Sequence, residues 1–191
     1  MPITSVLIAG VGGQGVVLAS ELLALAAIAA GHDAKQGEFH GVAQRGGAVF
    51  SHVRFGDRVY SPTTPRGEVD FLVALEKLEA LRYAHFVRPG RTILVNSHEV
   101  EPIRTADERS YPKDAIRFLE SKGFDVKAIK ATEIAVTLGN HRAANTVMLG
   151  ALAEHLDLPD QVWEKTLQQR IPEKLLELNR KAFGEGRQRG Q

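Results

Sequence analysis

The amino-acid sequence predicts an α/β protein: a three-layer, Rossmann-like open sheet with an added hairpin and a helical C-terminal third. Three observations predict this class. A β-branched apolar run over residues 3–9 stops at a glycine turn and is followed by helix-forming residues over 16–30. A second strand–helix–strand pattern occupies residues 69–95, and the chain from residue 143 has helical spacing. Alternating strands and helices are typical of a parallel sheet with helices on both faces.

The N-terminal half contains a buried helix and a glycine-rich loop. Residues 16–30 are apolar on nearly every side, as in a helix packed between a sheet and another layer, and Gly31 ends the pattern. Residues 35–47 hold four glycines and show no strand or helix periodicity, which predicts an ordered loop. A hairpin is predicted next, with its turn at Gly56-Asp57 between two strand-like stretches, residues 48–55 and 58–61.

The remaining elements follow from apolar spacing and from glycine and proline stops. We predict strands at 69–75, 92–95 and 125–129, and helices at 76–86, 111–122, 143–156, 159–169 and 172–183. No polar linker divides the chain, so residues 1–183 are predicted to form one domain. The polar, glycine-containing residues 184–191 are predicted to be a disordered tail.

Composition excludes several classes of protein. The chain has 191 residues, a formal net charge of +1 and no cysteine. The near-neutral charge argues against a nucleic-acid binder. The absence of cysteine excludes disulfides, a thiol nucleophile, a thiolate zinc site and a cysteine-ligated iron–sulfur cluster. If the protein takes part in redox chemistry, the redox centre must come from an added cofactor or a partner chain.

No membrane or export segment is expected. The longest apolar stretch, residues 16–30, contains Ser20 and Glu21 and is shorter than the roughly 20 apolar residues that a spanning helix needs. The first basic residue is Lys35, so the N-terminus lacks the charged region of a signal peptide. We therefore expect a cytoplasmic protein.

Residues 10–15 satisfy the pattern G-x-G-x-x-G between a predicted strand and a predicted helix. Such a turn directs backbone N–H groups and a helix dipole at an anion. The absence of Lys or Arg before residue 35 excludes a lysine-bearing P-loop. Asp33 has the spacing of a ribose-binding acid, but the residues around it do not resemble a buried strand. Three interpretations stay open: tight packing alone, contact with an anion or cofactor, and a true NAD(P) or FAD site.

The loop at residues 37–47 brings together an acid, an imidazole, an amide and a guanidinium: Glu38, His40, Gln44 and Arg45. Arg45 before two glycines suits recognition of a carboxylate or phosphate. The alternative is a surface loop with solvated charges. The candidate catalytic residues are Glu38, His40 and Arg45. The candidate cofactor-binding residues are Gly10, Gly12, Gly13, Gln14, Gly15, Gln44, Arg45, Gly46 and Gly47.

Other catalytic motifs are weak. Seven histidines occur, but none completes an H-E-x-x-H pattern, so no metal site is predicted. No G-x-S-x-G sequence supports a serine hydrolase. Asn140 is expected to cap a helix, and Asn145 to make an inter-helix hydrogen bond or an interface contact.

Three segments carry a resemblance to a known family: residues 10–16, 38–49 and 145–151. Together they resemble the gamma-type domain of 2-oxoacid:ferredoxin oxidoreductases. The sequence of residues 40–47, His-Gly-Val-Ala-Gln-Arg-Gly-Gly, is most similar to the small subunits of the indolepyruvate branch of that family. The resemblance runs from residue 6 to about residue 183.

The resemblance implies a heteromeric enzyme that decarboxylates an arylpyruvate, reduces ferredoxin and transfers the acyl group to coenzyme A. Thiamine diphosphate, Mg and 4Fe-4S clusters would then lie in a large partner subunit, and this chain alone would hold no cofactor. The turn at Gly12–Gly15 and the loop at Glu38–Gly47 would face the partner's cofactor or coenzyme A, with Arg45 as an anion clamp. The identity of the 2-oxoacid stays open. The alternative is a freestanding Rossmann-type NAD(P)-binding protein or dehydrogenase.

Overall fold

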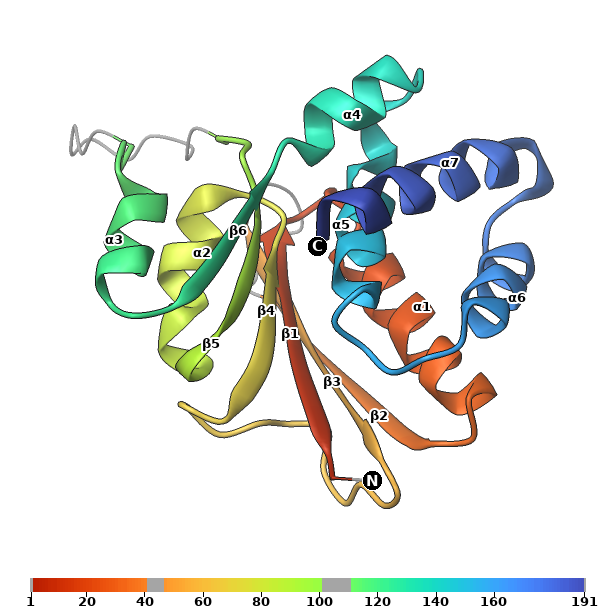
Figure 1. Ribbon diagram of the computed structural model, residues 1–191, viewed down its shortest axis with the longest axis horizontal. Helices are drawn as coiled ribbons and strands as arrows, with labels where there is room; N and C mark the ends of the chain where they lie inside the picture. The colour runs from red at the N-terminus through yellow and green to blue at the C-terminus, as the bar shows by residue number, and fades with distance from the viewer. Residues whose placement is uncertain (1, 41–46, 101–110, 191) are drawn as a thin grey trace.

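The computed structural model describes residues 2–40, 47–100 and 111–190. These residues form a six-stranded sheet with helices on both faces (Figure 1). The strands are β1 (Thr4–Val11), β2 (Asp33–His40), β3 (Ala48–Gly56), β4 (Val69–Ala74), β5 (Val87–Asn96) and β6 (Asp125–Ile129). The helices are α1 (Val16–Ala29), α2 (Lys77–Tyr83), α3 (Ala115–Ser121), α4 (Ala131–Thr137), α5 (Ala144–Ala153), α6 (Asp160–Arg170) and α7 (Glu173–Gly190), with short 3-10 turns η1 (Ala84–Phe86) and η2 (His141–Ala143).

The central strand β1 shows why the protein has three layers. Its residues 6–9 are completely buried. Val6 and Ile8 belong to the cluster packed under α1 and α5, whereas Leu7 and Ala9 belong to the cluster packed under α2. A strand with apolar side chains on both faces needs cover on both faces. Helices α2 and α3 lie on one side of the sheet and α1, α5, α6 and α7 on the other (Figure 1), which confirms the predicted α/β architecture.

The sheet order is β2-β3-β1-β4-β5-β6. Strands β1, β4, β5 and β6 run parallel to one another, whereas β3 runs antiparallel to both β1 and β2. The helix after β1 packs on one face and the helix after β4 on the other. The boundary between β1 and β4 is therefore a topological switch point, where the carboxyl ends of the strands open a crevice.

The predicted hairpin at 48–55 and 58–61 is wrong. Strand β3 pairs instead with β2, which the sequence analysis interpreted partly as a loop. Strand β2 is an edge strand with no buried residue, so its polar side chains stay hydrated. Residues 58–61 do not form a strand: Arg54 donates to the carbonyl oxygens of Ser61 and Thr63, both at 3.1 Å, so this segment folds back across β3.

The C-terminal residues also differ from the prediction. Helix α7 continues to Gly190, whereas residues 184–191 were expected to be disordered. The cause is close packing on α5: a Cβ on Gly186 would lie 1.9 Å from the Val147 carbonyl oxygen, and one on Gly190 would lie 2.4 Å from the Ala151 carbonyl oxygen. These glycines are contact points between two helices rather than signs of a flexible chain. Helix α4 was not predicted.

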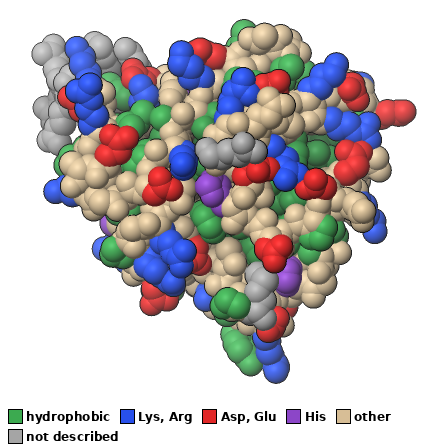
Figure 2. Space-filling view, in the orientation of Figure 1, with side chains coloured by type: hydrophobic (Ala, Val, Ile, Leu, Met, Phe, Trp, Pro, Cys, Tyr) green, Lys and Arg blue, Asp and Glu red, His purple; other side chains and the backbone are tan. Residues whose placement is uncertain are grey.

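The visible surface carries charges of both signs, mixed over its whole area (Figure 2). This distribution agrees with the formal net charge of +1. In the described part of the chain, no helix is both long and apolar enough to cross a membrane.

Candidate functional site

The glycine turn between β1 and α1 is closed by one side chain. The backbone N–H of Val11 donates to Oε1 of Gln14 at 2.8 Å, and the N–H of Gln14 donates to the Val11 carbonyl at 3.0 Å. Gly13 and Gly15 have φ values of 102° and 84°, the left-handed region that favours glycine. A Cβ on Gly10 would lie 2.8 Å from Oε1 of Gln14. The pattern found in the sequence therefore has a steric reason at three of its glycines.

Helix α5 anchors this turn from the other side. Asn145 is 3% exposed, and its Nδ2 donates to the Gly15 carbonyl at 3.2 Å. Its Oδ1 accepts from the N–H of Thr146 at 2.8 Å, and the Thr146 hydroxyl donates to Oδ1 of Asn179 on α7 at 2.7 Å. The expected inter-helix role of Asn145 is confirmed. Asn140 caps η2 by accepting from the N–H of Arg142 at 3.0 Å.

The last residue of the predicted loop at residues 37–47 forms a hydrogen bond with the glycine turn. The N–H of Gly12 donates to the Gly47 carbonyl at 2.9 Å. Gln44, Arg45 and Gly46 lie outside the described residues. Glu38 is exposed near the end of β2 and accepts from Nε2 of Gln36 at 3.0 Å. The described ends of the predicted loop and the glycine turn thus lie at the same end of the sheet, where β1 and β2 end and β3 begins.

A groove of about 700 Å³ lies beside the turn, over the start of α1. We call it the lateral groove. It brings together the predicted residues His40, Gly12, Gly13 and Gly15. Sequence reasoning missed an ion pair on its wall between Arg170 and Glu21, which joins the end of α6 to α1. The full lining is Val11, Gly12, Gly13, Gly15, Val16, Val17, Leu18, Glu21, His40, Val49 and Arg170.

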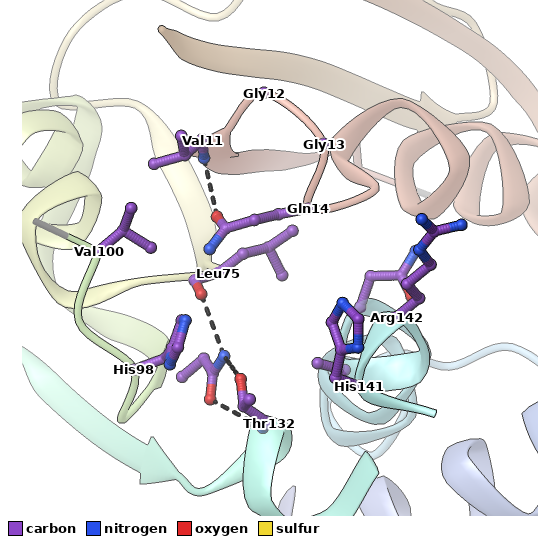
Figure 3. Close-up of a pocket in the computed structure, with 13 residues that line it drawn as sticks. Val11, Gly12, Gly13, Gln14, Leu75, His98, Val100, Thr132, His141 and Arg142 are labelled. Carbon is purple, nitrogen blue, oxygen red and sulfur yellow. Dashed lines mark hydrogen bonds between the residues drawn. The ribbon is translucent and has the colours of Figure 1, made fainter. Parts of the chain in front are cut away.

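A second, smaller pocket of about 240 Å³ lies at the switch point between β1 and β4 (Figure 3). We call it the switch-point pocket. Gln14 reaches over it from the glycine turn, with His98 and His141 on opposite sides (Figure 3). The full lining is Val11, Gly12, Gly13, Gln14, Leu75, Asn96, His98, Val100, Thr132, His141, Arg142, Ala144 and Asn145.

Sequence reasoning missed the polar residues that come to this pocket from beyond residue 90. His98 follows β5, Thr132 begins α4, and His141 and Arg142 lie in η2. The sequence offered only weak signals: two histidines outside any known motif, one of them beside a helix cap. Their convergence depends on the strand order, which places the end of β5 near the end of β1.

The segment that carries His98 is held against the N-terminus of α2. The N–H of Lys77 donates to the His98 carbonyl at 3.1 Å, and Nζ of Lys77 contacts Oε1 of Glu99 at 2.8 Å. Glu76, which is 1% exposed, caps α2 and accepts from the Tyr111 hydroxyl at 2.6 Å. Burial raises the pKa of Glu76, although these hydrogen bonds oppose the shift.

The structure does not place Asp33 where the ribose-binding acid of a dinucleotide site would lie. Asp33 does lie in a strand, but at the start of β2, where it accepts from the N–H of Val59 at 2.7 Å. The ribose-binding acid of a Rossmann site lies at the carboxyl end of the strand next to β1. Here that neighbour is the antiparallel β3. Within the described residues, no group of three or more His, Cys, Asp or Glu side chains could hold a metal ion.

A glycine turn at the switch point, with a pocket on each side, defines a class: open α/β domains with a ligand-facing crevice at the carboxyl ends of their strands. A model of the pyruvate ferredoxin/flavodoxin oxidoreductase family matches residues 5–189, and the chain belongs to this family. Its relatives and neighbours in structure include separate subunits of similar length.

The subunit IorB of the indolepyruvate oxidoreductase from Pyrococcus horikoshii is 34% identical over 95% of this chain and 93% of its own. The corresponding subunit from Archaeoglobus fulgidus is 36% identical over 95% and 92%. In structure, the chain is similar to the gamma subunit of a keto/oxoacid ferredoxin oxidoreductase from Geobacter sulfurreducens, with a TM-score of 0.75, 29% identity and 98% coverage of both chains. These comparisons confirm the family that the sequence motifs indicated.

Proposed function

We propose that this chain is the small subunit of an indolepyruvate (arylpyruvate):ferredoxin oxidoreductase that works in the cytoplasm. In the proposed reaction an aryl 2-oxoacid loses CO₂, its acyl group forms a thioester with coenzyme A, and the electrons released reduce ferredoxin. The observation that carries the proposal is the similarity to indolepyruvate oxidoreductase subunits along nearly the whole of both chains.

The redox and carbon-bond chemistry is assigned to a large partner subunit. This chain has no cysteine, and its described residues offer no cluster of metal ligands. These residues do not fit an iron–sulfur cluster or the Mg of thiamine diphosphate. We therefore derive no chemical step on this chain, and we assign thiamine diphosphate, Mg and the 4Fe-4S clusters to the partner.

The proposed contribution of this chain is to complete the walls of the site. The glycine turn is rigid, because Gln14 closes it and Asn145 holds it from below. The N–H groups of Val11, Gly12 and Gln14 donate within the protein, so the groups that suit a phosphate are the N–H groups at the N-terminus of α1. The phosphate would be one of coenzyme A or of the partner's cofactor. In this assignment Arg45 is the anion clamp, and Glu38 and His40 are polar contacts at the end of β2.

Reconstitution tests the proposal. The chain should co-purify with a large, thiamine-containing subunit from the same organism, and the complex should reduce a viologen dye with indolepyruvate and coenzyme A. The proposal is overturned if this chain alone reduces the dye, or if the large subunit is fully active without it. Phenylpyruvate and pyruvate in parallel assays define the range of 2-oxoacids.

The clamp role of Arg45 has its own test in the assembled enzyme. Arg45→Ala should lower turnover, whereas Arg117→Ala, an exposed change on α3, should leave it unchanged. Unchanged turnover in Arg45→Ala, with normal assembly, would instead favour a scaffold or regulatory subunit.

A further inference from the structure

Most of the polar side chains that line the switch-point pocket can donate hydrogen bonds. Among the residues that the structure describes, its lining contains two imidazoles, a guanidinium, amides and a hydroxyl, and no Asp or Glu. In Gln14 the oxygen Oε1 already accepts from Val11, so the group that remains for a ligand is the Nε2 amide, which can only donate. The described lining of the pocket is therefore rich in hydrogen-bond donors.

Two described carboxylates that adjoin pocket residues in the sequence form ion pairs with lysines. Glu99, next to His98, contacts Nζ of Lys77 at 2.8 Å. Glu133, next to Thr132, contacts Nζ of Lys130 at 3.2 Å. Neither Glu99 nor Glu133 lines the pocket. Glu99 and Glu133 are thus paired with lysines rather than with the imidazoles and guanidinium of the pocket. The buried Glu76, at the N-terminus of α2, interacts electrostatically with His98 but does not line the pocket.

The floor of the pocket is rigid. Asn96 is 2% exposed and lies at the end of β5. Its Nδ2 donates to the Leu75 carbonyl at 3.1 Å and to the Thr132 hydroxyl at 2.9 Å, and its Oδ1 accepts from the Thr132 N–H at 3.3 Å. One buried amide therefore joins the end of β4, the end of β5 and the start of α4. Donors carried by fixed elements lose little entropy when a ligand binds.

From these observations we infer that the switch-point pocket binds an anionic group, a carboxylate or a phosphate, between His98, His141 and Arg142. A volume of about 240 Å³ suits a small anion or the charged end of a longer ligand. A guanidinium and imidazole N–H groups are donors suited to both kinds of oxyanion. The inference rests on the proposed function in its choice of ligands: the carboxylate of the 2-oxoacid or a phosphate of the coenzyme.

Histidine NMR of the full chain tests the inference directly. Inorganic phosphate and indole-3-pyruvate are titrated separately, and the imidazole signals of His98 and His141 are followed. Both signals should shift in a saturable way with one of the two probes, and that probe identifies the source of the anion. His85, which is exposed and contacts the ring of Phe86 at a tilt, is the internal control. If neither probe moves His98 and His141, or if His85 moves equally, the inference is wrong.

Variants separate binding from folding. Arg142→Gln and His98→Gln should each weaken the binding of the effective probe by about tenfold, because each removes a charge-assisted hydrogen bond. Arg117→Gln, an exposed change on α3, should bind as tightly as the parent. Unfolding curves show that each variant is folded. If Arg142→Gln and His98→Gln bind the probe as tightly as the parent does, the assignment of these residues is wrong.

Assembly with the large subunit distinguishes the two proposals. If the complex forms and turns over indolepyruvate while both probes leave the histidines unmoved, only the anion site is wrong. If a probe binds but the chain neither assembles nor supports turnover, the anion site is supported and the proposed function is wrong.

Discussion

At the scale of single residues, the contact between Gly15 and Asn145 is the closest fit in the candidate site. Gly15 caps α1 in the left-handed conformation, and a Cβ there would lie 2.3 Å from Nδ2 of Asn145. Gly13 is also left-handed, but nothing lies within 4 Å of its Cβ position. Substitution of Gly13 therefore tests backbone strain alone, whereas substitution of Gly15 tests backbone strain together with a steric clash.

We predict that Gly13→Ala lowers the free energy of unfolding by about 1–2 kcal/mol through backbone strain alone, and that Gly15→Ala lowers it further. The double variant Gly15→Ala/Asn145→Ala should lose less than the sum of the two single changes, because removing the amide makes room for the methyl group. Urea unfolding of the parent, the three single variants and the double variant measures this. Equal losses in Gly13→Ala and Gly15→Ala would contradict the steric argument.

Two buried titratable side chains, Glu79 on α2 and His52 on β3, should change stability with pH in opposite directions. Burial raises the pKa of Glu79, which is 2% exposed, to about 7 from 4.5. Burial, with a smaller effect of Arg54, lowers the pKa of His52 to about 4 from 6.5. His52 lies among the rings of Phe39, Phe50 and Phe86. In both cases the folded protein favours the uncharged form.

For Glu79, the folded protein binds more protons than the unfolded chain between pH 4.5 and 7, so stability falls as the pH rises through this range. Glu79→Gln removes the titration. Relative to the parent, this variant should gain about 3 kcal/mol in the free energy of unfolding between pH 4.5 and 7. Urea unfolding at each pH measures the difference, and a difference independent of pH would refute the prediction.

For His52, the unfolded chain binds more protons between pH 4 and 6.5, so stability falls as the pH drops through this range. His52→Leu should therefore gain stability relative to the parent as the pH is lowered from 6.5 to 4. The same unfolding series tests this. A variant that instead loses relative stability in acid would show that the imidazole is charged in the folded protein.

At the scale of elements, the packing of α5 on α7 depends on glycine. Gly150 lies against the Phe183 carbonyl, and Gly186 and Gly190 lie against carbonyls of α5. Backbone atoms cannot move aside as a flexible side chain can. The two helices approach closely because these positions have no side chain, and this contact keeps the last residues of α7 helical.

Gly186→Ala should lower the free energy of unfolding by about 2 kcal/mol or more, because the methyl group would force the helices apart. Gly184→Ala is the matched control two positions away, where nothing lies within 4 Å of the Cβ position. It should stabilise the protein by up to about 1 kcal/mol through helix propensity. Thermal or urea unfolding compares the two. A stabilising Gly186→Ala would mean that α7 does not pack on α5 in this way.

Strand β2 is an element that the sequence pattern did not predict. Gly37 and the polar residues Lys35, Gln36 and Glu38 resemble a loop by composition. They form a strand because β3 supplies a hydrogen-bonding partner along its full length. Such pairing between segments has no local signature in an edge strand.

At the scale of the whole molecule, the strand order decides what the glycine turn can bind. In a dinucleotide site the strand next to β1 runs parallel to it and ends in the ribose-binding acid. Here β3 occupies that position in the antiparallel direction, and β2 lies beyond it. Asp33 lies at the far end of β2, so it cannot meet a ligand seated on the turn.

The isolated chain should therefore show no binding of NAD(H) at micromolar concentrations. Isothermal titration or the fluorescence of NADH measures this directly. Micromolar binding would restore the freestanding Rossmann-type alternative and count against the proposed small-subunit function.

The sequence by itself determined the α/β class, the glycine turn and the family. Each depends on neighbouring residues: the apolar run of β1, the G-x-G-x-x-G spacing and the motif at residues 38–49. Tertiary structure alone decided the pairing of β2 with β3, the helical end of α7 and the meeting of His98, His141 and Arg142 at one pocket. The physical reason is that hydrogen-bond partners across strands, close contacts between helices and convergence at a switch point all join residues far apart in the chain.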